Sequence, residues 1–114
     1  MAGNVTGVSG VAANQLSAPY SILFDSNNSL YIADALNDRI QKWTKGATSG
    51  LTVAGQSNGV AGSSLNSFNF IVGMVMDSEG NLYFTDRINH RVMYWANGAA
   101  SGSIIAGITS KRDD

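Results

Sequence analysis

The sequence contains no cysteine and a single histidine, His90, in 114 residues. The absence of cysteine excludes disulfides, zinc–thiolate sites and thiol catalysis. Charged residues make up only 13% of the chain, the net charge is −1, and the seven lysines and arginines are scattered. Because nucleic-acid surfaces usually show clustered basic residues, we expect no nucleic-acid partner. The longest apolar run is too short to span a bilayer, so we expect a soluble protein with no membrane partner.

The chain does have an internal repeat with a period of 52 residues. Its matching pairs include Asp25 and Asp77, Tyr31 and Tyr83, Asp34 and Asp86, Asn37 and Asn89, Arg39 and Arg91, and Trp43 and Trp95. The register does not slip over this length, which indicates a duplicated unit. We divide the chain into one copy at residues 3–54, a second at 55–106, and the truncated start of a third at 107–114. Because the chain spans two whole periods in one phase, we expect it to be part of a longer array.

Each copy predicts four short strands, and no stretch has a helical apolar period. The predicted strands are residues 21–24, 30–33, 39–43 and 51–54, then 73–76, 82–85, 91–95 and 103–106. The first two strands of each copy are apolar at consecutive positions, so both faces of the sheet must be covered. A sandwich would leave alternate positions polar, and a β-helix would use shorter repeats. The pattern therefore predicts an all-β chain of two β-propeller blades, each a four-stranded antiparallel sheet.

The same stretches resemble the NHL repeat. In the first copy they are residues 19–25 (PYSILFD), 29–34 (SLYIAD) and 37–43 (NDRIQKW), and in the second 80–86 (GNLYFTD) and 89–95 (NHRVMYW). The Asn-His-Arg-Val step typical of the family stands at 89–92. The first copy departs from it with Asp38 in place of histidine, and the second has Ile71 where the family usually has proline.

The resemblance implies a propeller fold and a binding function, and it does not imply a particular activity. NHL propellers commonly have six blades and mostly bind proteins, some bind RNA, and a few related propellers are enzymes with a metal ion in the central channel. Two blades leave one apolar face open on each side, of opposite kind, so we expect head-to-tail association. Six blades would then require three chains, a C3 homotrimer. We also expect either the outermost strand or residues 3–18 to lap onto the neighbouring chain.

Two acid–base pairs, Asp34 with Arg39 and Asp86 with Arg91, recur at the ends of one loop. They could form an anion or ligand site at the rim, or an ion pair that braces the loop in each blade. Function usually breaks repeat symmetry, whereas a scaffold obeys it. The repetition therefore favours the bracing role.

The other candidate residues also favour structural roles. His90 lies in the family's structural motif, and a metal or a catalytic triad would need further ligands or partners to converge on it. Trp43 and Trp95 could stack on a sugar or a base, but equivalent positions favour packing between blades. The glycine-rich residues 3–10 and 55–62 lack the Lys-Ser/Thr step of a phosphate loop and predict the crossing between blades.

These observations predict a non-catalytic, self-assembling scaffold or protein-interaction module with no cofactor and no catalytic or metal residue. Two alternatives stay open. One is a fragment of a metal-dependent propeller enzyme, a lyase or hydrolase, and the other is a ligand- or RNA-binding propeller.

Overall fold

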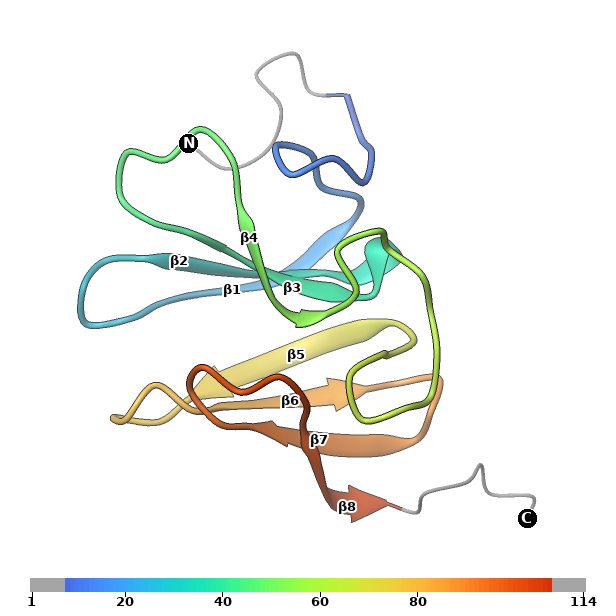
Figure 1. Cartoon of the computed structure of the whole chain (residues 1–114). Coiled ribbons are helices and arrows are strands. Elements are labelled where there is room, and N and C mark those ends of the chain that lie inside the picture. The colour runs from blue at the N-terminus through green and yellow to red at the C-terminus, as the bar shows by residue number, and fades with distance from the viewer. Residues whose placement is uncertain (1–7, 108–114) are drawn as a thin grey trace.

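The computed structural model describes residues 8–107 and contains two four-stranded antiparallel sheets (Figure 1). The first sheet has the order β1 (Pro19–Phe24), β2 (Leu30–Asp34), β3 (Arg39–Trp43) and β4 (Leu51–Gly55). The second sheet has the order β5 (Ile71–Met76), β6 (Leu82–Asp86), β7 (Arg91–Trp95) and β8 (Ser103–Gly107). One turn of 3-10 helix, η1 (Ala35–Asn37), joins β2 to β3. The all-β prediction is confirmed, and the arrangement is compatible with two propeller blades.

The first strand of each sheet begins earlier than the sequence predicted, at Pro19 and at Ile71. In both sheets the pairing with the second strand then shifts before the next paired residue, Ser21 or Gly73. Such an irregularity breaks the regular alternation of side chains. The apolar pattern therefore identified only the part of each strand beyond the shift.

The β1–β2 and β5–β6 connections are tight turns built on an aspartate. In the second sheet, Asp77 accepts hydrogen bonds from the backbone N–H groups of Glu79 and Asn81. The hydrogen bonds from Asn81 hold the pKa of the Asp77 carboxyl below its usual value. Asp25 accepts the equivalent bonds in the first sheet. The repeated aspartates therefore close the hairpins, as turn residues do.

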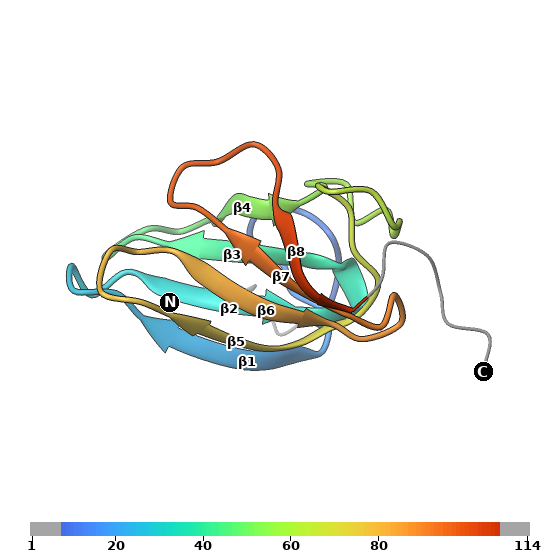
Figure 2. The ribbon, with the colours of Figure 1, turned by 90° about the horizontal axis from the view of Figure 1, so that it is seen from below.

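The two sheets stack so that their first strands, β1 and β5, lie at the same edge (Figure 2). The face of the first sheet that packs inward carries Tyr31, Ala33, Ile40 and Ala54. The face of the second sheet that meets it carries Met74, Leu82, Phe84, Met93 and Trp95. These two sets are not equivalent by the repeat. The sheets therefore meet through two unlike faces, as in a head-to-tail contact.

The segments that precede β1 and β5 lie along the sheets that they lead into. The N–H of Gly50 donates to the carbonyl of Ala13 at 2.7 Å, and that of Gly102 donates to Leu65 at 2.7 Å. The described part of the first segment, residues 8–18, thus packs on its own chain. The expectation that this segment or the outermost strand also laps onto a neighbouring chain stays a prediction.

Within residues 8–107, no helix is long and apolar enough to cross a membrane.

Phe68, in the segment between the sheets, completes the core. Its fully buried ring makes edge contacts with Phe84 and Trp95, with centroids 4.9 and 5.7 Å apart. Replacing Phe68 with alanine leaves a cavity, so we expect the free energy of unfolding in urea to fall by about 3–5 kcal/mol. Leu65→Ala, at an exposed position of the same segment, should cost less than about 1 kcal/mol. Equal losses in the two variants would contradict this account of the core.

Candidate functional site

The Asp86–Arg91 pair lies fully inside the protein. The Nε atom of Arg91 is 2.8 Å from the carboxylate of Asp86, which also accepts hydrogen bonds from the Asn89 side chain and the backbone N–H of Asn69. The remaining guanidinium nitrogens donate to three backbone carbonyls of the segment between the sheets, those of Ser63, Ser64 and Ser67.

The first sheet builds the same arrangement around Asp34 and Arg39. These side chains are also 2.8 Å apart and buried, with Asn37 and the backbone N–H of Ser17 as further donors to the carboxylate. Arg39 donates to the carbonyls of Val11, Ala12, Gln15 and Ser57. Planar guanidinium groups suit this role because each offers five donors in a fixed fork. The geometry thus supports the bracing role, since both charges are paired and shielded from an incoming anion.

Asp38 and His90 occupy the same repeat position, yet the structure places them differently. Asp38 is buried and accepts a hydrogen bond from the backbone N–H of Phe70 at 2.7 Å. Burial raises the pKa of the Asp38 carboxyl, and the nearby carboxylates of Asp86 and Asp34 raise it further. His90 is exposed on the open side of the second sheet. Sequence reasoning missed the role of Asp38, although its departure from the repeat was the available signal.

The two tryptophans lie on equivalent faces of their sheets, but only the face that carries Trp95 packs against the other sheet. Trp95 belongs to the cluster between the sheets, as predicted for both, and its indole N–H donates to the carbonyl of Ala99 at 3.0 Å. Trp43 is buried but lies on the outer face of the first sheet, beside Gly50. Both side chains are nearly covered within the chain, so their rings are not available for stacking on a sugar or a base.

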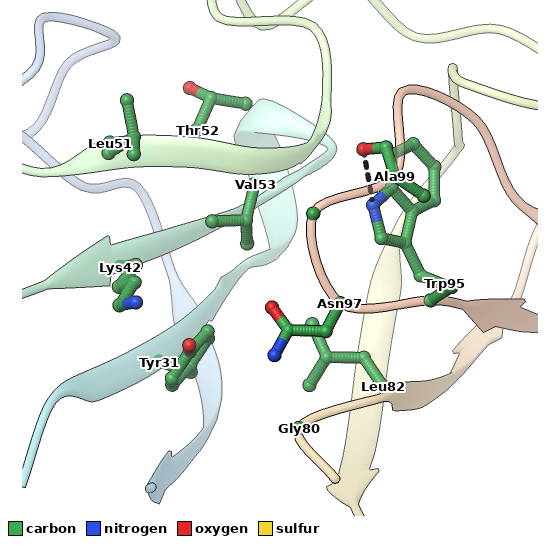
Figure 3. A pocket seen from close by; sticks show the side chains of 12 residues that line it. Tyr31, Lys42, Leu51, Thr52, Val53, Gly80, Leu82, Trp95, Asn97 and Ala99 are labelled. Carbon is green, nitrogen blue, oxygen red and sulfur yellow. Dashed lines mark hydrogen bonds between the residues drawn. The ribbon is translucent and has the colours of Figure 1, made fainter. Parts of the chain in front are cut away.

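A hollow of about 290 Å³ opens between the two sheets (Figure 3). Tyr31, Lys42 and Val53 line it from the first sheet, and Leu82 and Asn97 line it from the second. The ammonium group of Lys42 lies 5.4 Å from the centre of the Tyr31 ring, a cation–π distance. The hollow combines apolar walls with the Lys42 ammonium group, the Asn97 amide and the hydroxyl groups of Tyr31 and Thr52, a mixed lining that could hold a small group.

Within residues 8–107, no three side chains of His, Cys, Asp or Glu gather as metal ligands would. Residues 3–7 of the first glycine-rich segment lie outside the described residues. In the second glycine-rich segment, Gly55 ends β4, and residues 56–62 form the start of the crossing to β5. No protein-family model matches this sequence, and no curated protein matches it.

Removing the carboxylate of Asp86 would leave Arg91 buried with an unpaired charge. We expect Asp86→Ala to lower the free energy of unfolding by about 3–5 kcal/mol. Asp77→Ala removes a carboxylate from an exposed turn and serves as the matched control, with a smaller loss. Both are measured by urea denaturation followed by circular dichroism. A fully stable Asp86→Ala protein that had lost one identified ligand would instead make the pair a binding site.

Proposed function

We propose that the chain is a two-blade, NHL-like propeller module that associates head-to-tail with copies of itself and serves as a non-catalytic scaffold or protein-interaction surface. The observation that carries this proposal is that the open face of the second sheet repeats the covered face of the first. Ala33, Ile40 and Ala54 are fully buried by the second sheet. Their counterparts, Thr85, Val92 and Ala106, are exposed or half-buried in the described part of the chain.

The outer face of the first sheet supports the same proposal from the other side. Met74 is 9% exposed in the contact between the sheets, whereas its counterpart Ile22 is 62% exposed. Val75, on the open face of the second sheet, is 63% exposed. Phe24, on the same face of β1 as Ile22, is also 62% exposed, and exposed apolar side chains that gather on one face mark an interaction surface. A second copy fits it because each open face matches one of the two faces that already pack together inside the chain.

The two copies differ at two positions on these faces. Gln41 stands where the second copy has Met93, and Thr85 stands where the first has Ala33. The Gln41 side chain is already fully buried within the chain and accepts a hydrogen bond from the Thr52 hydroxyl, so we do not count it among the groups that would meet a second copy.

The size of the assembly follows from closure. Head-to-tail contacts either close into a ring or grow without limit, and propellers close with roughly four to eight blades. The NHL resemblance favours six blades, hence three chains around a central channel. The outer rims of such a ring would offer a surface for binding another protein, as the resemblance to NHL propellers implies.

Light scattering on dilute protein tests the proposal. We expect the mass of three chains of 12.0 kDa each. Val92→Lys places a charge on the open face and should yield a folded monomer, because an unpaired charge is strongly disfavoured in a buried contact. Ser101→Lys, in an exposed loop of the same sheet, is the control and should assemble normally. A stable, well-folded monomer of the unaltered chain would overturn the proposal.

A further inference from the structure

A hydrogen bond joins the two sheets at the end of the β2–β3 loop. The carboxylate of Asp38 accepts the backbone N–H of Phe70 at 2.7 Å. Phe70 has a φ of 70°, a left-handed conformation that is costly for a residue with a side chain. This conformation and the buried carboxylate together fix the entry of β5 against the first sheet.

The repeat counterparts of Asp38 and Phe70 lie apart, on the two open sides of the molecule. His90 stands at the position of Asp38 and has the same φ of 55°. Ala18 stands at the position of Phe70 and is also left-handed, with a φ of 53°. Among the acceptors of residues 8–107, none takes the N–H of Ala18. Among the described residues, Ala18 therefore adopts the strained conformation of Phe70 without a counterpart of the Asp38 carboxylate that Phe70 has.

We propose that His90 accepts the Ala18 N–H of a second copy of this chain, and that protonation of the ring opens the junction between copies. This inference rests on the proposed head-to-tail assembly. The Nδ1 atom of histidine and the Oδ1 atom of aspartate are both bonded to Cγ, so they reach the same place from the same backbone. A neutral imidazole has one accepting nitrogen, whereas an imidazolium has none and would turn a donor toward the N–H.

The space at His90 is suited to such a contact. A hollow of about 390 Å³ on the open face is lined by His90 together with Thr85, Val92 and Ala106. The corresponding place on the first sheet is covered by Phe70 and Ile71, and Ile71 is fully buried there. By the repeat, residues 18 and 19 of the next copy would enter the hollow at His90.

The charged groups around this position are already paired. The carboxylates that influence Asp38 are Asp34 and Asp86. His90 would correspondingly face its own Asp86 and Asp34 of the next copy. Each of these is bound at 2.8 Å by an arginine, Arg91 or Arg39. Arg87, a further cation, also lines the hollow. A protonated His90 would therefore find no free carboxylate to pair with. Loss of the hydrogen bond from Ala18 then makes acid weaken the contact between copies.

The test is the mass of the assembly as a function of pH, by native mass spectrometry or sedimentation. Assembly should be complete at pH 8 and weaken toward pH 5.5, because acid favours the imidazolium form, which cannot accept the N–H. Loss of one buried hydrogen bond predicts a dissociation constant about ten-fold or more higher per junction. Circular dichroism at each pH checks that the chain remains folded.

His90→Asp is the matched variant, because aspartate already serves at position 38. A carboxyl group keeps an accepting oxygen whether or not it is protonated, so this variant should assemble equally at both pH values. It also separates the effect of His90 from that of the α-amino group, which titrates in the same range.

The outcomes separate the two proposals. A chain that is monomeric at every pH overturns both the assembly and the role of His90. An assembly that is equally stable across this range, or that tightens in acid, leaves the proposed function standing and overturns the inference. An acid response that is unchanged in His90→Asp does the same.

Discussion

The guanidinium group of Arg91 lies buried between one carboxylate and three backbone carbonyls of the segment that joins the sheets. That segment has no strand or helix of its own, so its carbonyls must find donors elsewhere. Arg91 supplies them, and Asp86 pairs with the guanidinium charge and orients the group. With the segment held in this way, Phe68 reaches over Phe84 and Trp95 and closes the core between the sheets. The stacking of the two sheets therefore depends on a polar interaction that fixes where the apolar side chains meet.

Much of this fold could be read from the sequence because its signals are local. Consecutive apolar residues identified the first two strands of each sheet, and the aspartate-led turns separated them. The repeated spacing of Asp86 and Arg91 identified the ion pair. The carbonyls that the arginine binds could not be predicted, because any residue supplies the same backbone group. The left-handed conformations of Phe70 and Ala18 were equally hidden, since tertiary contacts impose them and neither residue type favours them.

The two copies share a backbone but differ where it matters for contact. Asp38 and His90 have the same φ, and their N–H groups donate to equivalent carbonyls, those of Ala35 and Arg87. What differs is the side chain that each presents toward the next sheet. Met93 and Gln41 also differ, since the first is apolar and lies in the cluster between the sheets, whereas the second is polar, fully buried and paired with Thr52. The contact between the sheets is thus mostly apolar, whereas the outer faces expose both apolar and polar side chains.

The unlike faces of the two sheets have a consequence for how such a protein could evolve. Each open face is the repeat counterpart of a face that is covered inside the chain. Adding a repeat to the gene and recruiting another chain would therefore be equivalent ways of covering the next sheet. A longer chain would gain its neighbours at the high effective concentration of a covalent link, whereas a short one depends on its abundance in solution. In the proposed assembly, gene length would then set how strongly association responds to dilution.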